Sequence, residues 1–316
     1  MVLKICSGFG RDVGVDAAIS VGSYPCLETR TPQFIETQVL AGCFPREQSR
    51  CLIARNPFML AYFPSLEQAK RRGMKREYHR WYSHRLGMEL GVVVYGHWGP
   101  PLLGFPTSAG DEWELEGQGM VSALADFIDG GRIKFFTVNS INGLSFYNKG
   151  AHPFHRSYVQ AMFDSYLHEE VVPFIWNNCQ TQGIAISTMG SSFGAYHAAN
   201  SLFKHPDVIK RCFAMSGVYD LRNFMDGMFD DNFYFNNPVD YLSNMSDPWF
   251  YEQIASCDIH ITTGTGPWEN SGPTYRLSEV LSSKGIRHSL DNWGPQGGHD
   301  WPYWKHQMRE YLSHLY

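Results

Sequence analysis

The fold is decided by the segment Ile184-Ala-Ile-Ser-Thr-Met-Gly190-Ser-Ser192-Phe-Gly194-Ala-Tyr-His-Ala-Ala199. An apolar, β-branched run leads into Gly-x-Ser-x-Gly, and small residues follow it. This order is typical of a nucleophile elbow, a sharp turn from strand to helix that presents one serine at its tip. Glycine two positions before and after the serine avoids collisions with the neighbouring helix and strand. Ser192 is therefore the candidate nucleophile; the alternative is a small buried residue in a tight turn.

Composition restricts the class of protein. The chain has 316 residues, 43% of them hydrophobic, and a formal net charge of −5. This length suits one large α/β domain with a substantial core. The mild acidity argues against a nucleic-acid partner, and no apolar run approaches the ~20 residues of a membrane span. Seven irregularly spaced cysteines and a beginning without the apolar core of a signal peptide favour a cytoplasmic location, and the Cys/His spacing predicts no metal site.

The chain divides into two unequal parts. Residues 1–73 contain four of the seven cysteines and show no sustained strand or helix period, so we expect an N-terminal extension of uncertain order. One hypothesis places the natural start near Met74, with a leader added before it. The other is an ordinary extension that packs on the domain. The sequence pattern of residues 74–316 is typical of a compact catalytic domain.

Strand-like and helix-like segments alternate from Met74 onward. Residues 78–85 and 88–95 predict an antiparallel hairpin, and later strands are predicted at 101–106, 133–138, 184–187, 212–216, 259–263 and 287–292. Helices are predicted at 119–128, 155–178, 195–205, 277–284 and 302–315, with Asp300 as N-cap of the last. This order predicts a mostly parallel central sheet with helices on both faces, a three-layer α/β sandwich.

The candidate catalytic base and acid lie on loops that follow strands near the end of the chain. A serine hydroxyl is a poor nucleophile until a base takes its proton, and the base needs an acid to orient it. After an elbow serine, acid and histidine follow along the chain, each on a loop after a late strand. The loop after 259–263 offers Glu269, and the loop after 287–292 offers His299. We expect His299 as base and Glu269 as acid; Asp220, after an earlier strand, is the rival acid.

Acyl transfer also needs backbone donors for the developing oxyanion. One expected donor is the amide of Phe193, directly after the serine, and the other is the amide of Thr107 or Ser108 in the loop after 101–106. The alternative for that loop is a plain turn. The aromatic segment 222–255 suggests a wall of the substrate pocket or, equally, the packing of an inserted helical segment.

At these residues the chain resembles the putative esterase family of the α/β-hydrolase fold, related to esterase D and the antigen 85 mycolyltransferases. The resemblance runs from about Arg76 to the C-terminus and rests on the blocks Glu77-Tyr-His-Arg-Trp-Tyr-Ser83, Gly104-Phe-Pro-Thr-Ser108, Met189-Gly-Ser-Ser-Phe-Gly-Ala195, Ser216-Gly-Val-Tyr-Asp220 and Gly298-His-Asp-Trp-Pro-Tyr-Trp304. It implies a triad of Ser192, His299 and Glu269, an acyl-enzyme intermediate and no cofactor.

These observations predict a serine esterase that hydrolyses small-molecule carboxylic esters. Two alternatives stay open: an acyltransferase that uses the same triad, and a catalytically silent binding protein of the same fold. The acyl chain length and the natural alcohol do not follow from the sequence. The oligomeric state is also open, and a homo-oligomer is compatible with the sequence.

Overall fold

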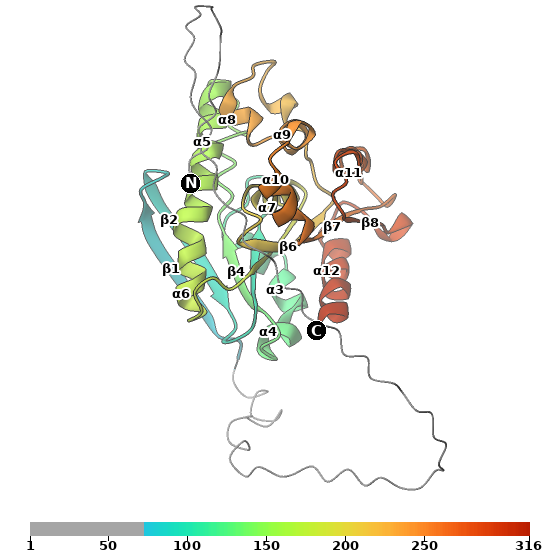
Figure 1. The fold of residues 1–316 in the computed structure, drawn as a ribbon. Helices are drawn as coiled ribbons and strands as arrows, with labels where there is room; N and C mark the ends of the chain where they lie inside the picture. Colours follow the sequence, from blue (N-terminus) through green and yellow to red (C-terminus); the bar gives the residue numbers. More distant parts are fainter. Residues whose placement is uncertain (1–72) are drawn as a thin grey trace, which may run out of the picture. The chain divides into compact units, whose positions relative to one another are not determined.

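The computed structural model describes residues 73–316 (Figure 1). Residues 1–72, almost all of the expected N-terminal extension, lie outside the described residues. Within the described part, eight strands form one sheet in the order β1-β2-β4-β3-β5-β6-β7-β8. Their bounds are β1 (Arg76–Ser83), β2 (Met88–Tyr95), β3 (Pro101–Phe105), β4 (Lys134–Val138), β5 (Ile186–Ser191), β6 (Ile209–Met215), β7 (Asp258–Thr263) and β8 (Ser289–Asn292). The pairs β1–β2 and β2–β4 are antiparallel and the others parallel.

The inner strands β2 to β6 are largely buried on both faces, which explains their apolar runs. Successive side chains on a strand point to opposite faces, and β2 shows the consequence. Val92 and Val94 contribute to one hydrophobic core, while Val93 and Tyr95 contribute to the other. The strands β2 to β6 each supply residues to both cores, whereas β7 supplies buried residues only to the first.

Helices cover each face (Figure 1). The first core is closed by α5 (Pro153–Tyr166), α6 (Val172–Asn178), α7 (Phe193–Lys204) and α11 (Gly272–Ser283). The second is closed by α2 (Glu114–Gly117), α3 (Met120–Ala123), α4 (Ala125–Asp129) and α12 (Trp301–Leu315). The predicted three-layer α/β sandwich is confirmed. The segment between β6 and β7 adds η2 (Arg222–Phe224), α8 (Asp231–Tyr234), α9 (Pro238–Asn244) and α10 (Pro248–Ala255).

Two predicted helices are interrupted. The one predicted over 119–128 is split into α3 and α4, because Leu124 leaves the helical conformation with φ −102° and ψ 9°. The stretch predicted over 155–178 contains a π-helical turn, η1 (Leu167–Val171), between α5 and α6. Pro173 is the second residue of α6, just after that turn. A proline lacks the N–H for the helix ladder and its ring crowds the preceding turn, and the wider turn accommodates it. None of the helices in residues 73–316 has both the length and the apolar character needed to cross a membrane.

The turn from β5 into α7 depends on two close backbone contacts. A Cβ on Gly190 would lie 2.2 Å from the carbonyl oxygen of Gly194 in α7, and a Cβ on Gly194 would lie 2.5 Å from the carbonyl oxygen of Pro106 after β3. Real Cβ atoms do not approach other atoms so closely, so both positions require glycine. These contacts bring the helix, the strand and the loop after β3 together at one point of the sheet.

Candidate active site

Ser192 lies at the tip of the turn between β5 and α7. Its backbone has φ 57° and ψ −122°, a strained conformation for a residue with a side chain. The surrounding main chain holds it: the Ser192 amide donates to the carbonyl of Met215 at 2.9 Å, and the Ser192 carbonyl accepts from the amide of Ala195 at 3.1 Å. Phe193 is the first residue of α7, so its amide has no acceptor within the helix. The turn thus presents a hydroxyl and a backbone donor side by side.

His299 reaches this serine from the loop before α12. Its Nε2 lies 3.0 Å from Oγ of Ser192, within hydrogen-bonding distance. The His299 amide donates to the carbonyl of Pro267 at 2.9 Å. The imidazole packs edge-on against the ring of Trp304, with centroids 5.1 Å apart at 81°. Main chain and an aromatic neighbour therefore both set the direction of the imidazole.

Glu269 lies on the other side of the imidazole ring. Its side chain is 0% exposed, and its Oε2 is 3.5 Å from Nδ1 of His299. Its Oε1 accepts a hydrogen bond from the Thr263 hydroxyl at 2.8 Å. Burial by itself raises the pKa of Glu269, but the neighbouring His299, Ser216 and Thr263 side chains outweigh it and leave the pKa below its ordinary value. The carboxylate is held ionised where it faces the imidazole.

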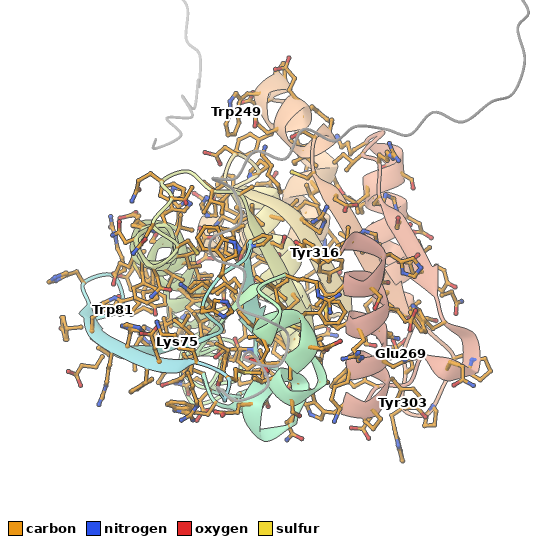
Figure 2. The ribbon with its side chains drawn as sticks, turned by 90° about the horizontal axis from the view of Figure 1, so that it is seen from below. Lys75, Trp81, Trp249, Glu269, Tyr303 and Tyr316 are labelled. Carbon is orange, nitrogen blue, oxygen red and sulfur yellow. The ribbon has the colours of Figure 1, made fainter. Side chains whose placement is uncertain are left out.

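The loops that carry Glu269 and His299 are joined by their main chains. The amide of Thr265 donates to the carbonyl of Gly294 at 2.8 Å, and the amide of Gly266 donates to that of Gly297 at 3.0 Å. A Cβ on Gly264 would lie 2.2 Å from the Gly297 oxygen, so the two backbones are in direct contact. In the view of Figure 2, Glu269 and Tyr303 of α12 are labelled on the same side of the molecule. The spacing of acid and base is therefore fixed by backbone.

The rival acid, Asp220, is engaged elsewhere. One of its oxygens lies 2.5 Å from Nη1 of Arg222, and the side chain is 36% exposed. Arg222 also pairs with Asp240, so the carboxylate belongs to a surface ion network. Asp300 caps α12, since its side chain accepts from the amide of Trp301, as the sequence predicts. Within residues 73–316, neither carboxylate is hydrogen-bonded to His299.

The loop after β3 distinguishes the two remaining oxyanion candidates. The amide of Thr107 donates to Oε2 of Glu114 at 2.6 Å, and its hydroxyl donates to Oε1 at 2.8 Å. That amide is occupied. The amide of Ser108 has no acceptor among the described residues, while the Ser108 carbonyl accepts from Nδ2 of Asn142. Ser108 is therefore the candidate with a free backbone donor.

An aromatic cluster packs around Phe193, directly after the Ser192 turn. The ring of Phe193 contacts those of Tyr147 and Phe224, with centroids 5.2 and 5.4 Å apart. Phe233 packs in the same cluster, through Phe146 at 6.4 Å. The segment after β6 thus packs against Phe193, and a role as a wall of the substrate pocket stays a prediction.

Several side chains around the site were not predicted from the sequence. Thr263 is visible only as the last residue of a predicted strand, and Trp304 only as part of an apolar helix face. Glu114 and Asn142 carry no local signal, because their partners at 107–108 are reached through the tertiary fold. In the described part of the chain, His, Cys, Asp and Glu side chains form no group of three or more that could hold a metal ion.

Comparison with known proteins agrees with this geometry. Residues 118–315 match the family described as "Putative esterase". The chain belongs to this esterase family. It is accordingly a carboxylic ester hydrolase of the serine hydrolase class. A comparison with curated proteins finds no match.

Solved structures share the fold at low sequence identity. A ferulic acid esterase superposes with a TM-score of 0.60 at 16% identity, over 77% of this chain and 99% of the other. An S-formylglutathione hydrolase from Agrobacterium tumefaciens gives 0.58 at 15% identity, over 76% and 94%. MPT51 from Mycobacterium tuberculosis gives 0.57 at 14% identity, over 76% and 97%. These likenesses confirm the α/β-hydrolase fold.

The lowered pKa of Glu269 predicts a pH-dependent contribution to stability. The ordinary pKa of the side chain is 4.5, and the folded protein lowers it. The ionised carboxylate therefore stabilises the fold above the unfolded-state pKa, and this contribution is lost as the pH falls through the lower folded-state pKa. We expect the difference in unfolding free energy between wild type and Glu269→Gln to be constant near neutral pH and to move against the wild type below about pH 4.5. Urea unfolding at a series of pH values measures this; a difference that does not change with pH would contradict it.

Proposed function

We propose that Ser192, His299 and Glu269 form a catalytic triad that hydrolyses carboxylic esters through an acyl-enzyme intermediate. The observation that carries this proposal is the line of contacts across one imidazole ring. Nε2 of His299 lies 3.0 Å from the Ser192 hydroxyl, and Nδ1 lies 3.5 Å from the buried Glu269 carboxylate. A nucleophile, a base and an orienting acid in this arrangement support acyl transfer.

The first half-reaction transfers the acyl group to the enzyme. The Ser192 oxygen attacks the ester carbonyl carbon while His299 Nε2 takes the hydroxyl proton, and Glu269 stabilises the imidazolium. The carbonyl oxygen becomes an oxyanion, for which the amides of Phe193 and Ser108 are the proposed donors. The intermediate collapses as the bond to the alcohol oxygen breaks. His299 returns the proton to that oxygen, and the alcohol leaves.

The second half-reaction releases the acid. Water gives a proton to His299 Nε2 and attacks the acyl carbon, and collapse of the second oxyanion returns the proton to Ser192. Ser192 is only partly buried, and the His299 side chain is 33% exposed. Water therefore reaches the acyl-enzyme, which favours hydrolysis over transfer to another alcohol.

Hydrolysis of p-nitrophenyl esters from acetate to octanoate tests the nucleophile. Ser192→Ala should lower kcat by roughly 10³–10⁶-fold. Ser191→Ala is the matched control, because this neighbouring serine is buried and its hydroxyl is unpaired within the described residues. We expect the control to keep turnover near the wild-type level. Equal activity of Ser192→Ala and wild type would show that another residue is the nucleophile.

The choice of acid is tested by two amide substitutions. Glu269→Gln removes the charge that faces Nδ1 of His299, and we expect kcat to fall by about 10²–10⁴-fold. Asp220→Asn weakens only the surface network with Arg222, and kcat should change by less than about threefold, as is usual for a surface change away from the site. The same p-nitrophenyl ester assay measures both variants. The opposite order of effects would move the acid to Asp220.

A further inference from the structure

We propose that Asn142 and His197 are positioning residues for the oxyanion hole. They form a buried relay from the elbow helix to the Ser108 carbonyl, which sets the direction of the Ser108 amide. This inference rests on the proposed function, since it concerns the same reaction. Neither residue contacts the hydroxyl of Ser192 or the imidazole of His299, so both would act through Ser108.

The relay begins on α7, five residues after the proposed nucleophile. Nε2 of His197 lies 2.8 Å from Oδ1 of Asn142, and Nδ2 of Asn142 donates to the carbonyl of Ser108. His197 is 1% exposed and Asn142 is 0% exposed, so water does not compete for these bonds. The helix that carries Ser192 is thereby linked to the loop that carries the second donor.

The Ser108 carbonyl determines which atoms of the relay donate hydrogen bonds and which accept them. A backbone carbonyl can only accept, so the amide nitrogen of Asn142 must face Ser108 and its oxygen must face His197. Nε2 of His197 must then carry the proton. Burial lowers the pKa of His197 to about 3, so the ring is neutral at the pH of an ordinary assay. A neutral ring with its proton on Nε2 supplies the donor that the relay needs.

Ser108 is held on both sides. On its N-terminal side, Thr107 is bound by Glu114, and the Thr107 carbonyl accepts from the amide of Gly110 at 3.1 Å. On its C-terminal side, the Ser108 carbonyl is bound by Asn142. These contacts fix the two peptide planes that meet at Ser108. The Ser108 amide then points in one direction, and it is unpaired among the described residues.

The loop after β4 is strained where it carries Asn142. Ile141 has φ 50°, which is an outlier for a β-branched residue. Local bonds hold it there: the amide of Ile141 donates to Oδ1 of Asn139 at 2.9 Å, and the hydroxyl of Ser140 donates to the carbonyl of Gly110 at 2.8 Å. Such strain persists only where the surroundings over-determine the conformation. Here the bond from Ser140 to Gly110 connects the loop after β4 to the loop after β3, which carries Ser108.

Asn142→Asp tests the relay with little change of shape. The carboxylate keeps an acceptor for His197 but places an oxygen, instead of a donor, against the Ser108 carbonyl. We expect kcat for p-nitrophenyl butyrate to fall about 10–10²-fold with KM changed less than about twofold, because a misdirected donor loses part of what a deleted donor loses. Asn200→Asp is the matched control. Asn200 is buried on α7, the helix that carries His197, but its bonds go to Asn236 and Tyr241, and kcat should stay within about threefold of wild type.

A pair of His197 variants tests the relay independently of how well Asn142→Asp folds. His197→Phe removes the donor to Asn142 and should lower kcat as Asn142→Asp does. His197→Gln offers an N–H at similar reach and should restore most of the loss. Equal kcat for the two His197 variants would overturn the relay.

A thionoester substrate separates a defect of the oxyanion hole from general damage. Sulfur accepts hydrogen bonds weakly, so hydrolysis of the thionoester gains less from the backbone donors. The ratio of ester to thionoester kcat should therefore fall in Asn142→Asp and His197→Phe and stay at the wild-type value in Asn200→Asp. A ratio in Asn142→Asp and His197→Phe that is unchanged, or that falls no more than in Asn200→Asp, would overturn the relay. Hydrolysis that depends on Ser192 would still stand in that case. Turnover that does not depend on Ser192 would overturn the proposed function and the relay with it.

Discussion

The strained turn at Ser192 is the constraint on which the rest of the site depends. A residue with positive φ at the tip of this turn is stable only if the helix, its strand and the next loop pack without gaps. Gly190 and Gly194 permit that packing, because any side chain there would overlap backbone carbonyls of α7 or of the loop after β3. The packing that holds Ser192 in this conformation also places the loop after β3 next to it.

The parallel strands bring the other groups to the same edge of the sheet. Loops after the carboxyl ends of β3, β5, β7 and β8 carry Ser108, Ser192, Glu269 and His299, and the open α/β sheet gathers them at one edge. Main-chain hydrogen bonds between the last two loops then set the distance of acid and base. Side chains with no part in the chemistry complete the arrangement, since Glu114 holds Thr107 and Asn142 holds Ser108.

A structural feature could be predicted from the sequence where the residues that cause it lie close together in the chain. The positions of the strands along the chain, the elbow and the loop that carries His299 follow from features that lie together in the chain, and the structure brings His299 to 3.0 Å from Ser192. The expectation of Glu269 over Asp220 rested only on its place after a later strand, because both residues follow strands and the packing of the loops, which the sequence does not show, turns Glu269 toward His299. Likewise, nothing near Thr107 in the sequence shows that Glu114 occupies its amide. The breaks at Leu124 and before Pro173 were missed because the apolar period continues through both.

The most direct test of the account is covalent labelling with a fluorophosphonate, which phosphonylates an activated serine. We expect one label per wild-type chain, located by peptide mass spectrometry on Ser192 and absent from His299→Ala, because the hydroxyl reacts only while the imidazole takes its proton. A label on a different residue, or equal labelling of the folded His299→Ala variant, would contradict the assignment of Ser192 and His299 as nucleophile and base.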